Sequence, residues 1–207
     1  METTIYPLKT SALILVDVLN DFLADDGKLH GLIGPMLAQT RLVENLQVLL
    51  AGARAAGLQV FYSPHGQDEH SFDGVKHIHP RFQAGIDNRV FWKGTYGAEF
   101  YAPLAPRDGD VVISRHHMFD SFIGTDLEAQ LRARGVERVI LAGLTSHTCV
   151  EGTGRHALEA GYHVTFLKDG VSEFTEAAHR AAIDLSYPTF GHETLTIAEF
   201  LARVEHA

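Results

Sequence analysis

Residues 139–150 have the sequence VILAGLTSHTCV, and this stretch decides which fold we expect. Its first four residues form an unbroken apolar run, which is typical of a parallel strand buried on both faces. The run ends at Gly143, and Thr148 and Glu151 then have the spacing of a capping box at a helix start. Cys149, the single cysteine of the chain, is therefore expected in the first helical turn, where the helix dipole favours its thiolate form.

Similar apolar runs alternate with helical patterns along the rest of the chain. The runs that predict strands cover residues 12–18, 58–62, 111–114, 139–142, 162–167 and the surroundings of Thr194. The patterns that predict helices cover residues 34–57, 125–135, 149–160 and 176–185, with a last helix from Ile197. This order predicts a single α/β domain over residues 1–207, with a mostly parallel sheet covered by helices on both faces.

The segment from Ser63 to Asp110 has no clear helical pattern and is rich in histidine and aromatic residues. Long irregular insertions in compact domains are usually functional, so we expect a lid, a pocket wall or a contact between subunits. Four histidines of the segment lack the spacing of a metal-ligand set: His65, His70, His77 and His79. We therefore expect neither a metal nor another cofactor.

Composition narrows the choice of partners and of cell compartment. The 207 residues carry a formal net charge of −9, which argues against nucleic acid or an anionic membrane surface as the main partner. One cysteine cannot form an internal disulfide, so we expect a cytoplasmic protein. Residues 1–11 have no cationic segment followed by an apolar core, and the apolar run 11–18 is too short to span a bilayer, so we expect neither a signal peptide nor a membrane anchor. We expect a small-molecule substrate and a homo-oligomer, either a dimer or a tetramer.

Reactive side chains follow three of the expected strands, namely Asp17, the pair Arg115 and His116, and Cys149. The carboxyl ends of parallel strands share one edge of a sheet, so these side chains are expected to meet there. A cysteine nucleophile needs a proton acceptor, a nearby cation and donors for an oxyanion. A structural interpretation stays open, because a lone cysteine is often an inert core residue and Asp17 can form an ion pair with Arg115.

Four motifs in this order resemble the isochorismatase-like cysteine hydrolases, a family that includes nicotinamidases, N-carbamoylsarcosine amidases, ureidoacrylate amidohydrolases and isochorismatases. The motifs are LVDVLNDF at residues 15–22, KGTYGAE at 93–99, SFIGTDL at 121–127 and AGLTSHTCV at 142–150. The resemblance covers nearly the whole chain. It implies a three-layer Rossmann-like fold with a six-stranded sheet, and hydrolysis of a C–N bond in a small amide, ureide or imide.

The resemblance also implies roles for single residues. Asp17 matches the general base of the family, and Cys149 matches its nucleophile, which forms a thioester with the substrate. A cis peptide bond at Leu144–Thr145 is implied, and the backbone N–H groups of Thr145 and Cys149 would then form an oxyanion hole. We also expect four residues to line the substrate pocket: Asn20, Phe22, Trp92 and Phe122.

One position departs from the family pattern. His116 stands where the family has its catalytic lysine, and Arg115 lies beside it. Arginine would keep the positive charge, whereas histidine keeps it only when protonated, so either residue could supply the cation. The sequence Ser63-Pro64-His65 also lacks the aspartate that holds a metal in nicotinamidases, which argues against a metal and against nicotinamide.

Two other functions stay open at this level. The first is vinyl-ether hydrolysis of the isochorismatase type, which uses Asp17 as an acid and needs no cysteine. The second is a non-catalytic binding protein that has kept the fold after losing the lysine. Loss of activity on replacing Cys149 would exclude both.

Overall fold

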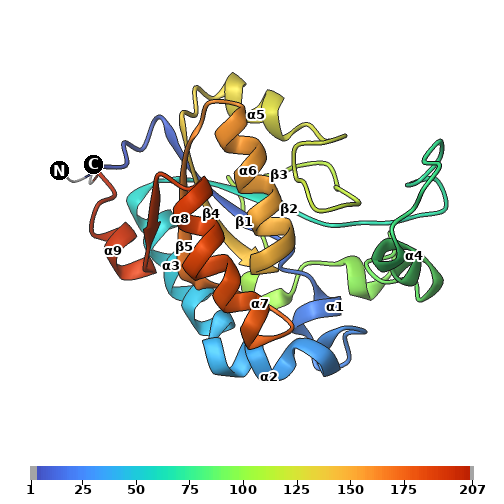
Figure 1. Cartoon of the computed structure of the whole chain (residues 1–207). Helices are drawn as coiled ribbons and strands as arrows, with labels where there is room; N and C mark the ends of the chain where they lie inside the picture. Colours follow the sequence, from blue (N-terminus) through green and yellow to red (C-terminus); the bar gives the residue numbers. More distant parts are fainter. Residues whose placement is uncertain (1–3, 206–207) are drawn as a thin grey trace.

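A computed structural model of the chain describes residues 4–205 (Figure 1). Six strands form one sheet in the order β3-β2-β1-β4-β5-β6, and each neighbouring pair is parallel. The strands are β1 (Ser11–Val16), β2 (Gln59–Ser63), β3 (Val111–Val112), β4 (Arg138–Leu144), β5 (His163–Ser172) and β6 (Glu193–Leu195). The predicted α/β fold with a six-stranded parallel sheet is thereby confirmed.

Helices connect the strands and cover the sheet. The α-helices are α1 (Asn20–Leu23), α2 (His30–Thr40), α3 (Leu42–Ala56), α4 (Pro80–Asp87), α5 (Leu127–Ala133), α6 (Glu151–Glu159), α7 (Glu176–Ala181), α8 (Tyr187–Phe190) and α9 (Ile197–Leu201). Two π-helical turns, Ser146–Val150 and Ala182–Ser186, precede α6 and α8. Short 3-10 turns lie at Tyr96–Ala98 and Ala102–Leu104. None of the helices within residues 4–205 combines the length and the apolar character that crossing a membrane requires.

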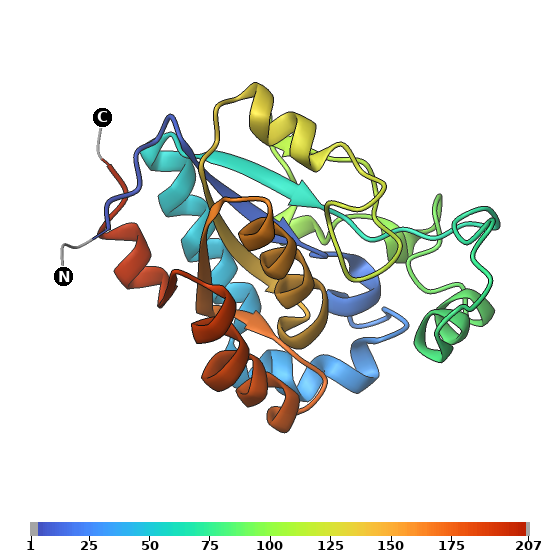
Figure 2. The ribbon, with the colours of Figure 1, turned by 45° about the horizontal axis from the view of Figure 1, so that its top comes forward.

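The central strand β1 contributes side chains to two separate cores. Leu13 and Leu15 join the core with apolar residues of α2, α3 and α9. Ile14 and Val16 join the core on the opposite face, with apolar residues of α5, α6 and α8. Side chains alternate between the faces of a strand, so a strand that is apolar at every position suits a sheet covered on both sides. Figure 2 shows these three layers, with α4 at one side of the molecule.

Two helix predictions need correction. The single helix expected over residues 34–57 is two helices, α2 and α3, because Arg41 between them has a left-handed φ of 51° and ends α2. The irregular segment 63–110 contains α4, which begins at Pro80 with a cap from His79, whose ring accepts the Arg81 N–H at 3.2 Å. Histidine is an uncommon cap, so the pattern of favoured capping residues did not show this helix.

The capping box predicted at Thr148 and Glu151 is also absent. The Thr148 hydroxyl lies 2.6 Å from Oγ1 of Thr145 and donates to Cys149, and Glu151 binds Arg155 across one helical turn. The chain turns from β4 into α6 through the π-helical turn Ser146–Val150 instead. Cys149 still lies at the beginning of a helical segment just past the carboxyl end of a central strand.

Candidate active site

The register of the sheet places Asp17 between two neighbouring strands. Val16, the last residue of β1, pairs with Ser63 on β2 and with Gly143 on β4. Gly143 has a φ of 116°, and a Cβ there would lie 2.1 Å from the Val16 carbonyl oxygen, so only glycine allows this approach. Asp17 itself has a left-handed φ of 56°, a conformation that aspartate adopts more readily than most residues.

The Asp17 carboxylate is fully buried and held by two donors. The His65 backbone N–H donates to Oδ1 at 2.7 Å, and Nε2 of His116 donates to the same oxygen at 2.9 Å. Burial works to raise the pKa of this carboxyl, but the charge and hydrogen bond of His116 outweigh it, so the net shift is downward. The other oxygen, Oδ2, is buried without a hydrogen-bond partner among the described residues. It is therefore an ionised carboxylate with one oxygen free to accept a proton.

His116 is held as a cation by its two neighbours. Nδ1 lies 2.7 Å from the Met118 carbonyl oxygen and Nε2 lies 2.9 Å from Asp17 Oδ1. Both neighbours only accept hydrogen bonds, so both ring nitrogens must carry a proton. Burial works to lower the pKa of His116, but the Asp17 charge and these hydrogen bonds raise it overall. A protonated imidazole thus occupies the place of the lysine in the family pattern.

Arg115 does not bind Asp17, although it precedes His116 directly. Its Nη1 donates to the His65 carbonyl oxygen at 2.7 Å, and its side chain packs against Gly66, where a Cβ would lie 2.3 Å from Arg115 Cδ. Arg115 therefore supports the backbone that presents the His65 N–H to Asp17. Of the two candidates left open by the sequence, His116 is the one in contact with the carboxylate.

Cys149 lies beside Asp17 and is buried, with 5% of its surface exposed. Burial raises the pKa of the thiol well above its usual value, and the negative charge of Asp17 raises it further. The Thr148 hydroxyl, 3.8 Å from Sγ, and the backbone N–H of Thr145 work in the opposite direction. The shift is opposite to the one expected from the helix start, because desolvation and the neighbouring carboxylate raise the pKa of the thiol.

The backbone around Thr145 has the conformation that the resemblance implies. The peptide bond Leu144–Thr145 is cis, and the Thr145 N–H faces the sulfur of Cys149 closely enough to affect its pKa. A backbone donor therefore lies beside the thiol, where an oxyanion would form.

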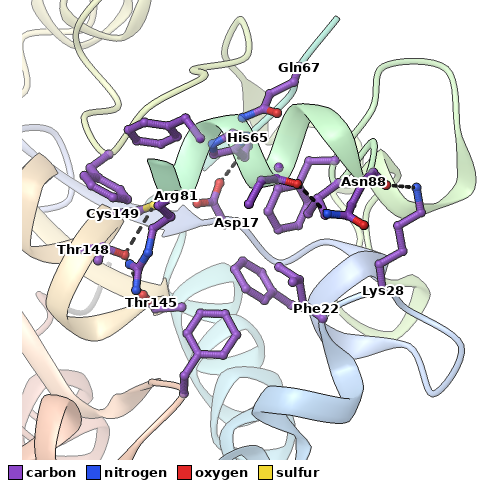
Figure 3. A pocket seen from close by; sticks show the side chains of 18 of the residues that line it. Asp17, Phe22, Lys28, His65, Gln67, Arg81, Asn88, Thr145, Thr148 and Cys149 are labelled. Carbon is purple, nitrogen blue, oxygen red and sulfur yellow. Dashed lines mark hydrogen bonds between the residues drawn. The ribbon is translucent and has the colours of Figure 1, made fainter. Parts of the chain in front are cut away.

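The acid, the thiol and the backbone donor line one cavity of about 890 Å³ (Figure 3). Its polar wall includes Asp17, His65, Gln67, Thr145 and Cys149. Most of the remaining wall is apolar and comes from α1, α2, α4 and nearby loops: Phe22, Leu29, Leu32, Phe82, Ala84, Gly85, Val90, Phe91, Phe119 and Phe174. Such a cavity suits a small, mostly apolar ligand with few polar groups.

Of the four residues expected in the pocket, only Phe22 is among those that line this cavity. The amide of Asn20 donates to the Tyr96 carbonyl oxygen at 2.9 Å and fixes the α1 segment to a neighbouring turn. Trp92 lies under the guanidinium of Arg89, and Phe122 stacks on His156 with ring centroids 4.5 Å apart. These three predictions need correction, because their side chains serve contacts outside the cavity.

Several residues of the cavity wall were not identified from the sequence. Gln67 has a buried Oε1 without a partner among the described residues, and His65 has a pKa lowered to about 3 by burial and by the His116 charge, so it is neutral. Arg81, Phe119 and Phe174 also line the cavity. They come from separate segments of the chain, and no spacing in the sequence links them.

The histidine-rich segment does not assemble a metal site. Among residues 4–205, no three His, Cys, Asp or Glu side chains lie together as a set of metal ligands. Ser63, two residues before His65, instead donates a hydrogen bond to Ser121 at 2.7 Å.

Comparison of the sequence with known protein families identifies the family to which the chain belongs. Residues 11–198 match the model of the isochorismatase domain. The chain belongs to the isochorismatase family. Within this family it is 35% identical over 108 residues to the uncharacterized protein YwoC of Bacillus subtilis, covering 52% of this chain but only 56% of that protein. It is 27% identical over 215 aligned positions to the ureidoacrylate amidohydrolase RutB of Yersinia enterocolitica, covering 99% of this chain and 90% of that protein.

Two solved structures of the isochorismatase-like type share the fold. A cysteine hydrolase from Pseudomonas syringae pv. phaseolicola has a TM-score of 0.81 at 26% identity, with 98% of each chain covered. The N-carbamoylsarcosine amidase from Thermoplasma acidophilum has a TM-score of 0.73 at 26% identity, covering 91% of this chain and 96% of that chain. The chain is thus an isochorismatase-family hydrolase with relatives that act on amides and ureides.

Proposed function

We propose that this protein hydrolyses a C–N bond in a small amide, ureide or imide, with Cys149 as nucleophile and Asp17 as general base. The observation that supports this most is that one carboxylate, that of Asp17, interacts with both the His116 ring and the Cys149 thiol. Asp17 binds the His116 imidazolium through Oδ1, and its Oδ2 has no hydrogen-bond partner among the described residues. Cys149 lies near enough for the Asp17 charge to raise the pKa of its thiol. The amidohydrolase activity of RutB and the amidase activity of the Thermoplasma acidophilum protein support the same reaction class.

The first half of the reaction follows from the charges of the site. Because the thiol is protonated at rest, Asp17 takes its proton as the sulfur attacks the substrate carbonyl carbon. The carbonyl oxygen becomes an oxyanion, which the backbone N–H groups of Thr145 and Cys149 stabilise. Asp17 then gives the proton to the leaving nitrogen, the C–N bond breaks, and a thioester with Cys149 remains.

The second half repeats these steps with water. Asp17, ionised again, takes a proton from a water molecule that attacks the thioester carbon. The tetrahedral intermediate collapses, the C–S bond breaks, and the proton on Asp17 returns to the sulfur. His116 stays protonated throughout and keeps Asp17 oriented, which is the role of the lysine in the family pattern.

A screen for ammonia release tests this function. The purified protein is incubated with a panel of small primary amides and ureides, and with imides whose amide products are followed by chromatography because their cleavage releases no ammonia. Each substrate found is repeated with Cys149→Ala. We expect this variant to lose about 10³-fold or more in kcat, because no other nucleophile is available. Full activity in Cys149→Ala together with loss in Asp17→Asn would refute the proposal and favour vinyl-ether hydrolysis. A homo-oligomer and a cytoplasmic location remain predictions from the sequence.

A further inference from the structure

The cavity carries positive charge, although the chain as a whole has a net charge of −9. The charged residues that line it are Asp17, Lys28 and Arg81. The negative charge of Asp17 is already balanced by the His116 imidazolium. His65 is neutral and adds no charge. Two cations in the cavity wall are therefore left without a counter-charge from the lining.

The two cations differ in how they are bound. The Lys28 ammonium donates to the backbone carbonyl oxygens of Asn88 at 3.0 Å and of Arg89 at 2.6 Å, so it is already occupied at the end of α4. The Arg81 guanidinium forms neither an ion pair nor a hydrogen bond with any side chain or backbone group of residues 4–205. It lies over the Phe119 ring, with Cζ 5.8 Å from the centroid. Arg81 is thus the cation that a ligand can bind.

The position of Arg81 connects it to the reacting groups. It extends from α4, on the wall of the same cavity that holds the Cys149 thiol and the Thr148 hydroxyl (Figure 3). The wall of this cavity also carries five phenylalanine rings: Phe22, Phe82, Phe91, Phe119 and Phe174. A ligand that fills the cavity therefore meets flat apolar ring surfaces and the guanidinium that extends from α4.

We propose that Arg81 binds a carboxylate of the substrate, so that the protein selects flat, apolar amides that carry this anionic group. A guanidinium presents several donors in one plane, which suits the two oxygens of a carboxylate. This inference rests on the proposed function for the reaction itself, but not for the binding of the anion.

Two pairs of probes separate binding from turnover. The first pair cannot be hydrolysed: para-acetylbenzoate carries a carboxylate, and para-diacetylbenzene is a neutral molecule of similar shape. Their dissociation constants are measured by titration calorimetry. We expect the carboxylate to bind about 10- to 100-fold more tightly, which is typical of a hydrogen bond to a charged group. Added salt should weaken this preference, because Arg81 is exposed.

The second pair consists of amides, para-carbamoylbenzoate and para-acetylbenzamide, and their kcat/KM values are compared by ammonia release. We expect a similar preference for the carboxylate. In Arg81→Gln the ratio of dissociation constants and the ratio of kcat/KM values should both fall to within about 3-fold of unity. Binding of the neutral probes should stay nearly unchanged, because only the charge-assisted hydrogen bond to the carboxylate is lost. Arg89→Gln is the matched control: this exposed arginine follows the same helix and lies 5.0 Å from the Trp92 ring, outside the cavity lining. It should leave both preferences intact.

The outcomes separate the two proposals. Anion-selective binding that Arg81→Gln abolishes, without turnover of either amide, supports the anion site and counts against the hydrolase function. Turnover without preference for the carboxylate overturns the anion site and leaves the hydrolase function standing. Equal losses for charged and neutral probes in Arg81→Gln, or no binding of either ketone, would also overturn the anion site.

Discussion

The two walls of the cavity differ in how the fold supports them. One wall, the strand wall, consists of the residues that directly follow β1 and β4, Asp17 and Thr145. Both are almost completely buried, with 1% of their surfaces exposed. The other wall includes α4 and its flanking loops, and Figures 1 and 2 both show α4 at the outer side of the molecule, away from the sheet. Much of α4 is exposed, and Phe82 is its only buried residue.

The contacts that hold each wall differ in kind as well. Asp17 and His116 are joined by hydrogen bonds between buried charged groups, next to strands that pair on both sides. The α4 wall depends on ring contacts and on the Lys28 ammonium bound to backbone carbonyls. Under the proposed function, the reacting groups therefore lie on the more deeply buried wall, and we expect substrate choice to depend on the exposed wall. Four predictions test this division.

The largest effect is expected for Asp17→Asn on the strand wall. An amide cannot take the thiol proton, so kcat should fall about 10²- to 10⁴-fold, the usual range for loss of a general base. Ammonia release measures this, and thermal unfolding reports whether the variant is folded. Asp120→Asn is a matched control, because Asp120 also pairs with a histidine, His156, at 2.6 Å but does not line the cavity. Near-normal activity in Asp17→Asn would contradict the placement of the reacting groups on the strand wall.

The second prediction concerns the dependence of activity on pH in the native protein and in His116→Lys. Asp17 has a lowered pKa, so it stays ionised in mild acid and the acid side of the profile should be flat down to about pH 5. His116 has a raised pKa, so activity should persist above pH 6.5 and fall as the imidazolium loses its proton. Lysine, with an ordinary pKa of about 10.4, should move this alkaline limb upward. If the alkaline limb of the profile stays at the same pH in His116→Lys, the loss of activity at high pH does not come from deprotonation of His116.

A smaller effect is expected for Phe82→Leu on the α4 wall. The Phe82 ring packs 4.7 Å from Phe119 and 5.9 Å from Phe72, measured between centroids. Its loss should change kcat/KM by less than about 10-fold, to a different extent for each substrate, because only the shape of an apolar wall changes. Phe72→Leu, which alters the same ring cluster outside the cavity lining, is the control. A uniform loss as large as that of Asp17→Asn would place Phe82 among the residues of the reaction.

The smallest effect is expected for Lys28→Met. This change removes the hydrogen bonds to the Asn88 and Arg89 carbonyl oxygens but leaves the strand wall untouched. KM should rise about 2- to 5-fold, in the range of a lost surface hydrogen bond, with kcat unchanged. Amide hydrogen exchange should become faster in α4 and stay the same in β1 and β4. Faster exchange in β1 would show that the two walls are coupled.

The residues at the strand ends were largely predictable from the sequence. For the α4 wall, the sequence predicted only that segment 63–110 forms a lid, a pocket wall or a subunit contact, and the segment does line the cavity. Apolar runs gave the strands, and the residues that end them placed Asp17 and Cys149 at one edge, since burial patterns are local signals. Phe22 was identified through its place in a motif, but Asn20, Trp92 and Phe122 were assigned to the pocket wrongly. A motif gives a residue's place in the chain, and the direction of its side chain depends on neighbours from other segments.

The residue pattern was sufficient to predict the architecture and the meeting of Asp17, the Arg115–His116 pair and Cys149 at one edge of the sheet. The periodicity of buried side chains is local, and parallel strands necessarily bring their carboxyl ends together. Three further features become visible in the folded chain: His116 rather than Arg115 binds Asp17, burial and Asp17 raise the pKa of the Cys149 thiol, and Arg81 lines the cavity. These properties depend on burial and on distances between groups far apart in the chain, and no local pattern of residues encodes either.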